Sequence, residues 1–160
     1  MTMKKERIDA MVNTINETEI EALLLSATHA HLGCHANGLT YVVPISFAYD
    51  GKRILGYTSA GQKTAMMREN PEVCIQVDEI KNLGEWKSAI VWGRYEELHE
   101  SQAAIAVGYL IDRYGPIFQD DPSPDHRGRE IIPPRVDSGL GERIVYCVHI
   151  TKKTGRAEHP

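Results

Sequence analysis

The segment from Leu39 to Tyr49 constrains the fold more strongly than any other part of the chain. Large apolar side chains occupy every second position (Leu39, Tyr41, Val43, Ile45, Phe47 and Tyr49), and the positions between them hold Thr40, Val42, Pro44, Ser46 and Ala48. A period of two with one large apolar face is typical of a strand that packs on a core. Asn37-Gly38 and Asp50-Gly51 flank the segment, and both pairs favour two-residue hairpin turns. The pattern therefore predicts an antiparallel sheet built from hairpins.

Similar patterns predict the remaining elements. Strands are expected at residues 29–35, 53–59, 72–78, 86–98 and 143–151. Helices are expected over residues 3–15, in a short segment that a Thr18–Glu21 capping box opens, over 61–70 and over 101–114. Six strands joined mostly by hairpins favour a small barrel with helices packed outside, because closing the sheet removes its exposed edges. The sequence thus predicts a mainly β fold with short peripheral helices.

Composition bounds the class of protein. A chain of 160 residues is expected to form a single domain, residues 1–160. Its net charge of -4 argues against a general nucleic-acid binder, which would carry a basic excess. No apolar run approaches the roughly 20 residues of a membrane helix, and no apolar stretch follows the charged start as in a signal peptide. Three widely spaced cysteines then indicate reduced thiols and a cytoplasmic protein.

Two C-terminal segments carry weaker patterns. Residues 115–141 are rich in proline and glycine and predict a long irregular stretch, of the kind that forms a lid or a partner contact. The polar end of the chain, residues 152–160, is expected to fray.

The segment Tyr57–Lys63 is the most informative for function. A predicted strand ends in Thr58 and Ser59, and a Gly turn then leads into a helix whose first turn carries Lys63. Unpaired N–H groups at a helix start, two hydroxyls and a lysine suit a phosphate monoester, although hydroxyls before a helix also serve as plain N-caps. The small residues Val42, Pro44 and Ser46 would let a flat ligand lie against their strand, or would simply face solvent at a sheet edge.

Other chemistry finds less support. The chain has no phosphate loop, dinucleotide-binding glycine motif, zincin motif or nucleophile elbow. His29, His31 and His35 would share one strand face, opposite Cys34, but their spacing matches no structural zinc pattern, so no metal site is expected.

Several segments in series resemble a known family. They are Gly38–Asp50, Tyr57–Lys63, Met67–Cys74, Val77–Glu79, Trp86–Arg94 and Thr154-Gly155-Arg156. Their order and spacing resemble the pyridoxamine 5'-phosphate oxidase-related, FMN-binding split-barrel family, and most closely its nitroimidazole-resistance (Nim-type) branch. The resemblance covers about residues 18–98 and 142–156.

The resemblance implies a homodimer of six-stranded split barrels with one FMN at each end of the interface. It implies that Tyr57, Thr58, Ser59, Gln62 and Lys63 hold the phosphate and ribityl chain. It further implies that Val42, Val43, Pro44, Ile45 and Ser46 lie against the isoalloxazine, and that Ser88, with Trp86, reaches in from the central strand. The expected activity is that of an FMN-dependent oxidoreductase acting on a small electron-poor substrate.

Two departures from the family narrow this expectation. Thr58 stands where Nim-type relatives commonly carry histidine, which weakens the case for nitroimidazole reduction. Gln62-Lys63 replaces the Arg-Lys pair of the oxidases proper, and their C-terminal arginine-rich motif is missing, which argues against vitamin B6 oxidation. No catalytic acid or base stands out. Three alternatives remain open. The protein could be a non-catalytic flavin carrier or redox sensor, or a haem-binding split barrel with His29, His31, His35 or His149 as axial ligand. FAD or a deazaflavin could also replace FMN as the cofactor.

Overall fold

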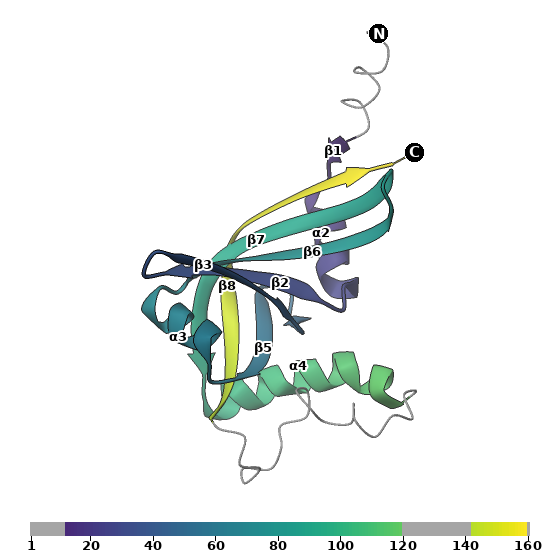
Figure 1. Ribbon diagram of the computed structural model, residues 1–160. Helices are drawn as coiled ribbons and strands as arrows, with labels where there is room; N and C mark the ends of the chain where they lie inside the picture. Colours follow the sequence, from purple (N-terminus) through teal and green to yellow (C-terminus); the bar gives the residue numbers. More distant parts are fainter. Residues whose placement is uncertain (1–11, 120–141, 160) are drawn as a thin grey trace, which may run out of the picture.

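The computed structural model of the chain describes residues 12–119 and 142–159. In these two ranges, eight antiparallel strands form one sheet that carries three helices (Figure 1). In chain order the elements are β1 (Val12–Thr14), α2 (Glu17–Ser26), β2 (Ala30–Ala36), β3 (Leu39–Ile45), β4 (Ala48–Tyr49), β5 (Arg53–Ser59), α3 (Gln62–Glu69), β6 (Glu72–Asn82), β7 (Glu85–Leu98), α4 (Glu100–Gln119) and β8 (Arg143–Glu158). The prediction of a mainly β, antiparallel fold with peripheral helices is confirmed, with eight strands in place of six.

The sheet curls toward a barrel but does not close. Its strand order is β3-β2-β6-β7-β8-β5-β4, with β1 added to β8. The two ends of this order, β3 and β4, are consecutive in the chain and are joined by Ser46 and Phe47 alone. The single strand predicted for 39–49 is therefore wrong at this point, because the chain leaves one sheet end and enters the other. The gap between β3 and β4 is the split of the barrel.

The predicted turns shape the hairpins around the split. Asn37 and Gly38 both have positive φ, at 51° and 76°, as the tight β2–β3 turn requires. Gly51 has φ 92° between β4 and β5, where the Asp50 carboxylate accepts the backbone N–H groups of Lys52 and Arg53. Pro44 lies on β3, which among the described residues pairs with β2 alone, so this proline, which has no backbone N–H to donate, occupies an edge strand.

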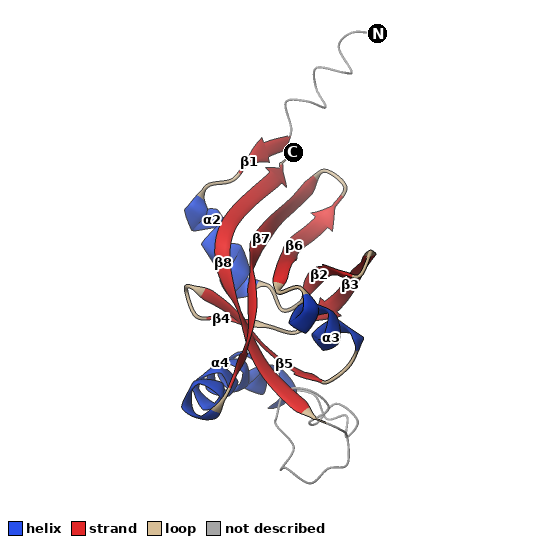
Figure 2. Ribbon diagram, turned by 90° about the vertical axis from the view of Figure 1, so that its left-hand side faces the viewer, coloured by secondary structure: helices blue, strands red, loops and turns tan. Residues whose placement is uncertain are grey.

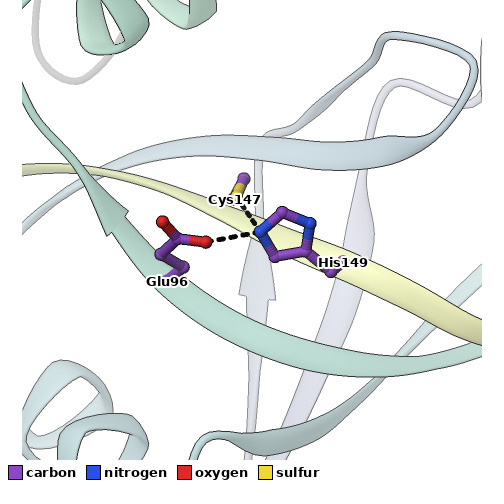
Figure 3. A group of neighbouring side chains, drawn as sticks. All are labelled: Glu96, Cys147 and His149. Carbon is purple, nitrogen blue, oxygen red and sulfur yellow. Dashed lines mark hydrogen bonds and ion pairs between the residues drawn. The ribbon is translucent and has the colours of Figure 1, made fainter.

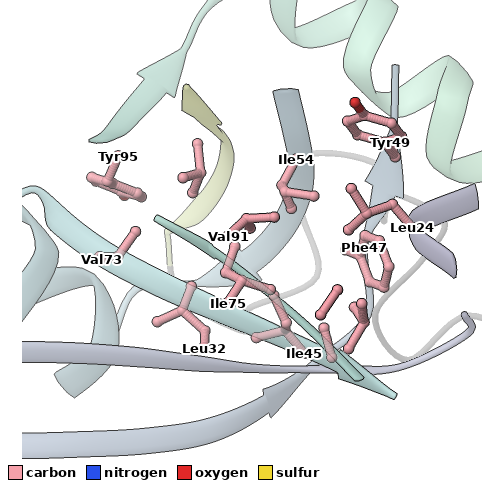
Figure 4. Close-up of a cluster of buried hydrophobic side chains, with 14 of the residues drawn as sticks. Leu24, Leu32, Ile45, Phe47, Tyr49, Ile54, Val73, Ile75, Val91 and Tyr95 are labelled. Carbon is pink, nitrogen blue, oxygen red and sulfur yellow. The ribbon is translucent and has the colours of Figure 1, made fainter. Parts of the chain in front are cut away.

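The main core fills the inside of the curled sheet (Figure 4). Alternate residues of β2, β5, β6 and β7 meet there, with fully buried Leu32, Ile54, Ile75 and Val91 at the centre. The large apolar face predicted for 39–49 joins this core from Tyr41 onward, whereas Leu39 is half exposed. This packing fixes which face of each strand points away from the core.

Helix α4 covers a second, smaller core on the outside of β5 and β8 (Figures 1 and 2). Leu110 and Tyr114 of the helix pack with Leu55 and Cys147 of the strands. The Tyr114 hydroxyl accepts the Phe47 N–H at 2.8 Å and lies 2.7 Å from the Thr28 carbonyl oxygen. One phenol thereby fixes both the β3–β4 crossing and the α2–β2 connection, the two segments that border the split.

The prediction of an N-terminal helix over residues 3–15 is wrong for residues 12–14, which form a strand. Residues 12–14 form β1 and pair with Arg156, Ala157 and Glu158 of β8, while residues 3–11 lie outside the described part. The free edge of β8 supplies hydrogen bonds that an isolated helix would have to provide for itself. The capping box of the next helix lies two residues before the predicted one, because Asn16 and Glu19 cap each other, at 2.9 and 3.1 Å.

Other corrections concern where elements end. Residues 152–158, expected to fray, continue β8, because β7 and β1 flank them with open hydrogen-bonding edges. Helix α4 runs five residues past the predicted stop at Tyr114, since a proline in the last turn removes one donor without ending the helix. The irregular stretch predicted for 115–141 is thus helical up to 119, and 120–141 lie outside the described residues. Strand β6 extends four residues beyond the predicted 72–78.

The three cysteines are free thiols, and Cys34 and Cys147 are buried as small apolar residues. The prediction of free thiols is confirmed for all three cysteines, and Cys74 is partly exposed. None of the described helices is both long and apolar enough to cross a bilayer.

Candidate functional site

A pocket of about 320 Å³ lies at the barrel split, where β3 ends and β5 leads into α3. Its lining residues come from five segments of the chain: His29, Pro44, Ile45, Ser46, Tyr57, Thr58, Lys63 and Tyr146. Two larger hollows, of about 640 and 540 Å³, lie elsewhere on the sheet and contain neither Thr58 nor Lys63. The pocket at the split is therefore the one that matches the predicted phosphate segment.

Six of the twelve predicted site residues meet in this pocket. They are Pro44, Ile45, Ser46, Tyr57, Thr58 and Lys63. Their convergence follows from the topology, because the β3 end and the β5 end lie on the two sides of the split. The small side chains predicted for one face of the 39–49 segment thus border the hydroxyls and the lysine predicted to take a phosphate.

The remaining predicted residues lie outside this pocket. Val42 is 62% exposed and lines another hollow, and Val43 packs against the main core. Gln62 is exposed at the start of α3. Ser59 accepts a hydrogen bond from the Arg143 guanidinium at 2.7 Å.

Trp86 and Ser88 lie on the β6–β7 hairpin, which extends away from α3 (Figure 1). The Trp86 indole N–H donates to Glu158 at 2.8 Å, and the Gln76 amide donates to the Ser88 hydroxyl at 3.0 Å. A single copy of the chain therefore does not bring these two residues to the pocket.

Helix α3 adds positive character to the pocket wall. Its N-cap is Gly61, and the Thr64 hydroxyl accepts the Gly61 N–H and donates to the Gly61 carbonyl, both at 2.9 Å. The first amides of the helix, at 62–64, have no acceptor within the helix, and its first turn carries no acidic residue. The helix dipole and the Lys63 ammonium thus both favour an anion here.

Tyr57 brings a neutral donor to the same wall. Burial raises the pKa of the Tyr57 phenol, and the Arg143 guanidinium, 5.9 Å from the ring centre, only partly opposes this. The hydroxyl therefore stays protonated at neutral pH. It is buried and has no hydrogen-bond partner among the described residues, so it can still donate to a bound molecule.

Two residues of the pocket, His29 and Tyr146, and the neighbouring Arg143 were not predicted from the sequence. Arg143 reaches Ser59 because β5 and β8 pair in a register that joins these two residues, and no local pattern specifies this register. Tyr146 enters through the same pairing. The sequence indicates His29 only as a possible metal ligand. It lies near the β3 end because the next residue, Ala30, pairs with Ile45.

The three N-terminal histidines have separate environments. His29 lies in the pocket, with Nδ1 3.1 Å from the Thr28 hydroxyl. His35 contacts the Thr40 hydroxyl through Nδ1 at 2.9 Å, and His31 is exposed on β2. Cys34 is buried on the opposite face of β2, as predicted.

An open antiparallel barrel with a pocket at its split is the architecture of split-barrel proteins. A family model described as pyridoxamine 5'-phosphate oxidase matches residues 16–157. The chain belongs to this family, as its resemblance in sequence led us to expect.

Individual relatives agree with the assignment. An uncharacterized protein of Rhizobium meliloti (strain 1021) is 30% identical over 150 residues, which cover 91% of this chain and 95% of that protein. The crystal structure of an FAD-binding protein from Mesorhizobium loti superposes with a TM-score of 0.72 at 25% identity, covering 94% of this chain and 98% of the other. A proposed 5-nitroimidazole antibiotic resistance protein from Bacteroides thetaiotaomicron shares the fold, with a TM-score of 0.68 at 20% identity and coverage of 91% and 87%.

Proposed function

We propose that this protein binds FMN in the pocket at the barrel split and acts as an oxidoreductase on a small electron-poor substrate. The observation that carries the proposal is the convergence of Lys63, Thr58 and the start of α3 beside the short side chains of Pro44 and Ser46. A ligand with a phosphate next to a flat ring system matches this pocket, because the phosphate would lie at Lys63 and Thr58 and the ring at Pro44 and Ser46. The FAD-binding protein of Mesorhizobium loti, which has the same fold, supports a flavin as the ligand class.

The donor set fits a phosphate. The Lys63 ammonium supplies a full positive charge, and the Thr58 hydroxyl and the first amides of α3 supply uncharged donors. None of the described residues that line this pocket is acidic, so none of them repels a dianion.

The other half of the pocket can hold a planar ring. Pro44 and Ser46 extend little from the edge strand, and Ile45 presents a buried apolar side chain below them. The flavin, when bound, would supply the hydride or electron transfer, and the protein would supply position and electrostatics. The Tyr57 hydroxyl would remain a donor, and the exposed His29 imidazole lies in the same pocket wall.

The position of Trp86 and Ser88 supports a homodimer. These residues could complete the pocket only if a second copy of the chain supplied them. Apolar side chains are exposed on the β2–β3 and β6–β7 hairpins, which such a dimer would join. They are Leu39 at 50%, Val42 at 62%, Ile80 at 67% and Leu83 at 97%.

If the site is shared between two chains, dilution to monomer should release flavin together with the partner. A monomer that retains flavin would contradict the shared site.

Turnover distinguishes an oxidoreductase from a flavin carrier. Under anaerobic conditions, the flavin-loaded protein should be reduced by a nicotinamide donor or dithionite. It should then be mixed with a quinone or a nitroaromatic compound. We expect bound flavin to be reoxidised by one of these acceptors faster than free reduced FMN at the same concentration. Reoxidation that needs oxygen, or that never exceeds the free-flavin rate, would assign the protein as a carrier or sensor.

A further inference from the structure

A second group of reactive side chains lies outside the pocket, on the face of the sheet where β7, β8 and β5 run side by side (Figure 3). Glu96, Cys147 and His149 each direct one potential ligand atom to a common point, and these atoms lie within 4.8 Å of one another. We call this set the Glu–Cys–His cluster.

Strand register brings the three residues together. Glu96 of β7 pairs directly with Cys147 of β8, so their side chains lie on the same face. His149 follows two residues later on β8 and shares this face. The cluster is therefore fixed by backbone hydrogen bonds and not by flexible loops.

One ring nitrogen serves both neighbours. His149 Nε2 lies 2.5 Å from a Glu96 carboxylate oxygen and 3.4 Å from Cys147 Sγ. A neutral imidazole carries at most one proton on Nε2, so it cannot donate to the carboxylate and also accept from the thiol. A soft thiol, a borderline imidazole and a hard carboxylate thus surround one point. A single proton on Nε2 can satisfy only one of the two contacts that this nitrogen makes.

We propose that the Glu–Cys–His cluster binds a divalent transition-metal ion, with Zn²⁺ as the preferred occupant. Cys147 Sγ, His149 Nε2 and a Glu96 oxygen would be the three protein ligands, and solvent would take the fourth position. Binding forms the metal–sulfur bond and releases the thiol proton to water.

The distances suit this ion. With Zn–S of about 2.3 Å and Zn–N of about 2.0 Å, a tetrahedral site separates sulfur and nitrogen by roughly 3.5 Å. The Sγ to Nε2 distance of 3.4 Å already meets this requirement. The Glu96 side chain, 57% exposed, has room to move away from His149 and admit the ion.

The surrounding charges are compatible with a cation. Thiolate and carboxylate together balance a divalent ion. Arg53, which faces Cys147 from β5, forms an ion pair with Asp50 at 3.0 Å, and Arg94 is 3.9 Å from Glu72. Cys147 is fully buried whereas His149 and Glu96 are about half exposed, so the site has a rigid inner ligand and an open side for entry.

Cobalt is the most direct probe, because a cobalt–thiolate bond produces a charge-transfer absorption band that other ligands do not. The full chain without a purification tag should be titrated with Co²⁺, and spectra recorded as differences from the metal-free protein so that flavin absorption cancels. We expect one equivalent of Co²⁺ to generate the thiolate band and Zn²⁺ to abolish it. We also expect Zn²⁺ at 100 times its Kd to raise Tm by roughly 5–10 °C.

Variants assign the ligands. Cys147→Ser should abolish the thiolate band, and His149→Gln and Glu96→Gln should each weaken metal binding by at least about 10-fold, since they remove direct ligands. The two surface variants keep the test valid if the buried Cys147→Ser variant folds poorly. Cys74→Ser and His31→Gln are the matched controls and should bind metal as the parent chain does. A missing thiolate band, or equal loss in the control variants, would overturn the proposal.

Discussion

Replacing Lys63 by alanine is expected to weaken FMN binding by about 10–100-fold, or roughly 1.4–2.7 kcal/mol. Lys63 is the lysine of the pocket at the split, and it borders Thr58 and the start of α3. Loss of its ammonium removes the full charge from a phosphate cradle and leaves only uncharged donors. Equilibrium titration of flavin fluorescence measures the change.

The matched experiment uses riboflavin, which lacks the phosphate. Lys63→Ala should leave riboflavin affinity nearly unchanged, because the ring contacts at Pro44, Ile45 and Ser46 remain. Lys52→Ala, at the exposed β4–β5 turn, is the control for loss of one positive charge and should bind FMN like the parent. Equal losses for FMN and riboflavin, or an unaltered FMN affinity, would show that Lys63 does not meet the phosphate.

Gly93→Ala is expected to destabilise the fold by about 3 kcal/mol, at the upper end of what overpacking usually costs. A Cβ atom at Gly93 would lie 2.3 Å from the His149 carbonyl oxygen and 2.7 Å from Val148 Cγ1. The contact with backbone is decisive, because a neighbouring strand cannot rotate away as a side chain can. Gly93 also adjoins the irregularity at which the β7–β8 register shifts by one residue.

Thermal unfolding followed by circular dichroism measures this effect. For a chain of this size, the change should lower Tm by roughly 6–12 °C. Gly108→Ala, in α4 with open space around it, is the control and should raise stability by up to about 1 kcal/mol, since alanine favours a helix more than glycine does. A Gly93→Ala protein as stable as the parent would mean that β7 and β8 do not pack as closely as the structure shows.

The sequence could predict those features that local patterns specify. The Asn37-Gly38 turn, the strand 53–59 and the helix stop before Pro71 are all present, because turn chemistry, alternation and the proline constraint act over a few residues. Pro44 at a sheet edge belongs to the same class, since the missing N–H excludes a central position.

Features that depend on pairing between distant segments could not be predicted. The polar end of β8 alternates poorly and resembles a tail, and it is a strand only because β7 and β1 flank it. Arg143 beside Ser59 and the Glu–Cys–His cluster follow from strand registers that no local pattern reveals. Half of the predicted flavin-site residues meet in one chain, and the proposed dimer would have to supply Trp86 and Ser88.

The central claim is that this protein binds flavin, and the visible absorption spectrum of the freshly purified protein, repeated after addition of FMN and of FAD, tests it most directly. We expect two flavin bands, quenching of flavin fluorescence on binding, and saturation at one FMN per chain. A haem Soret band, or no chromophore and no uptake of either flavin, would contradict the proposed function while leaving the fold assignment intact.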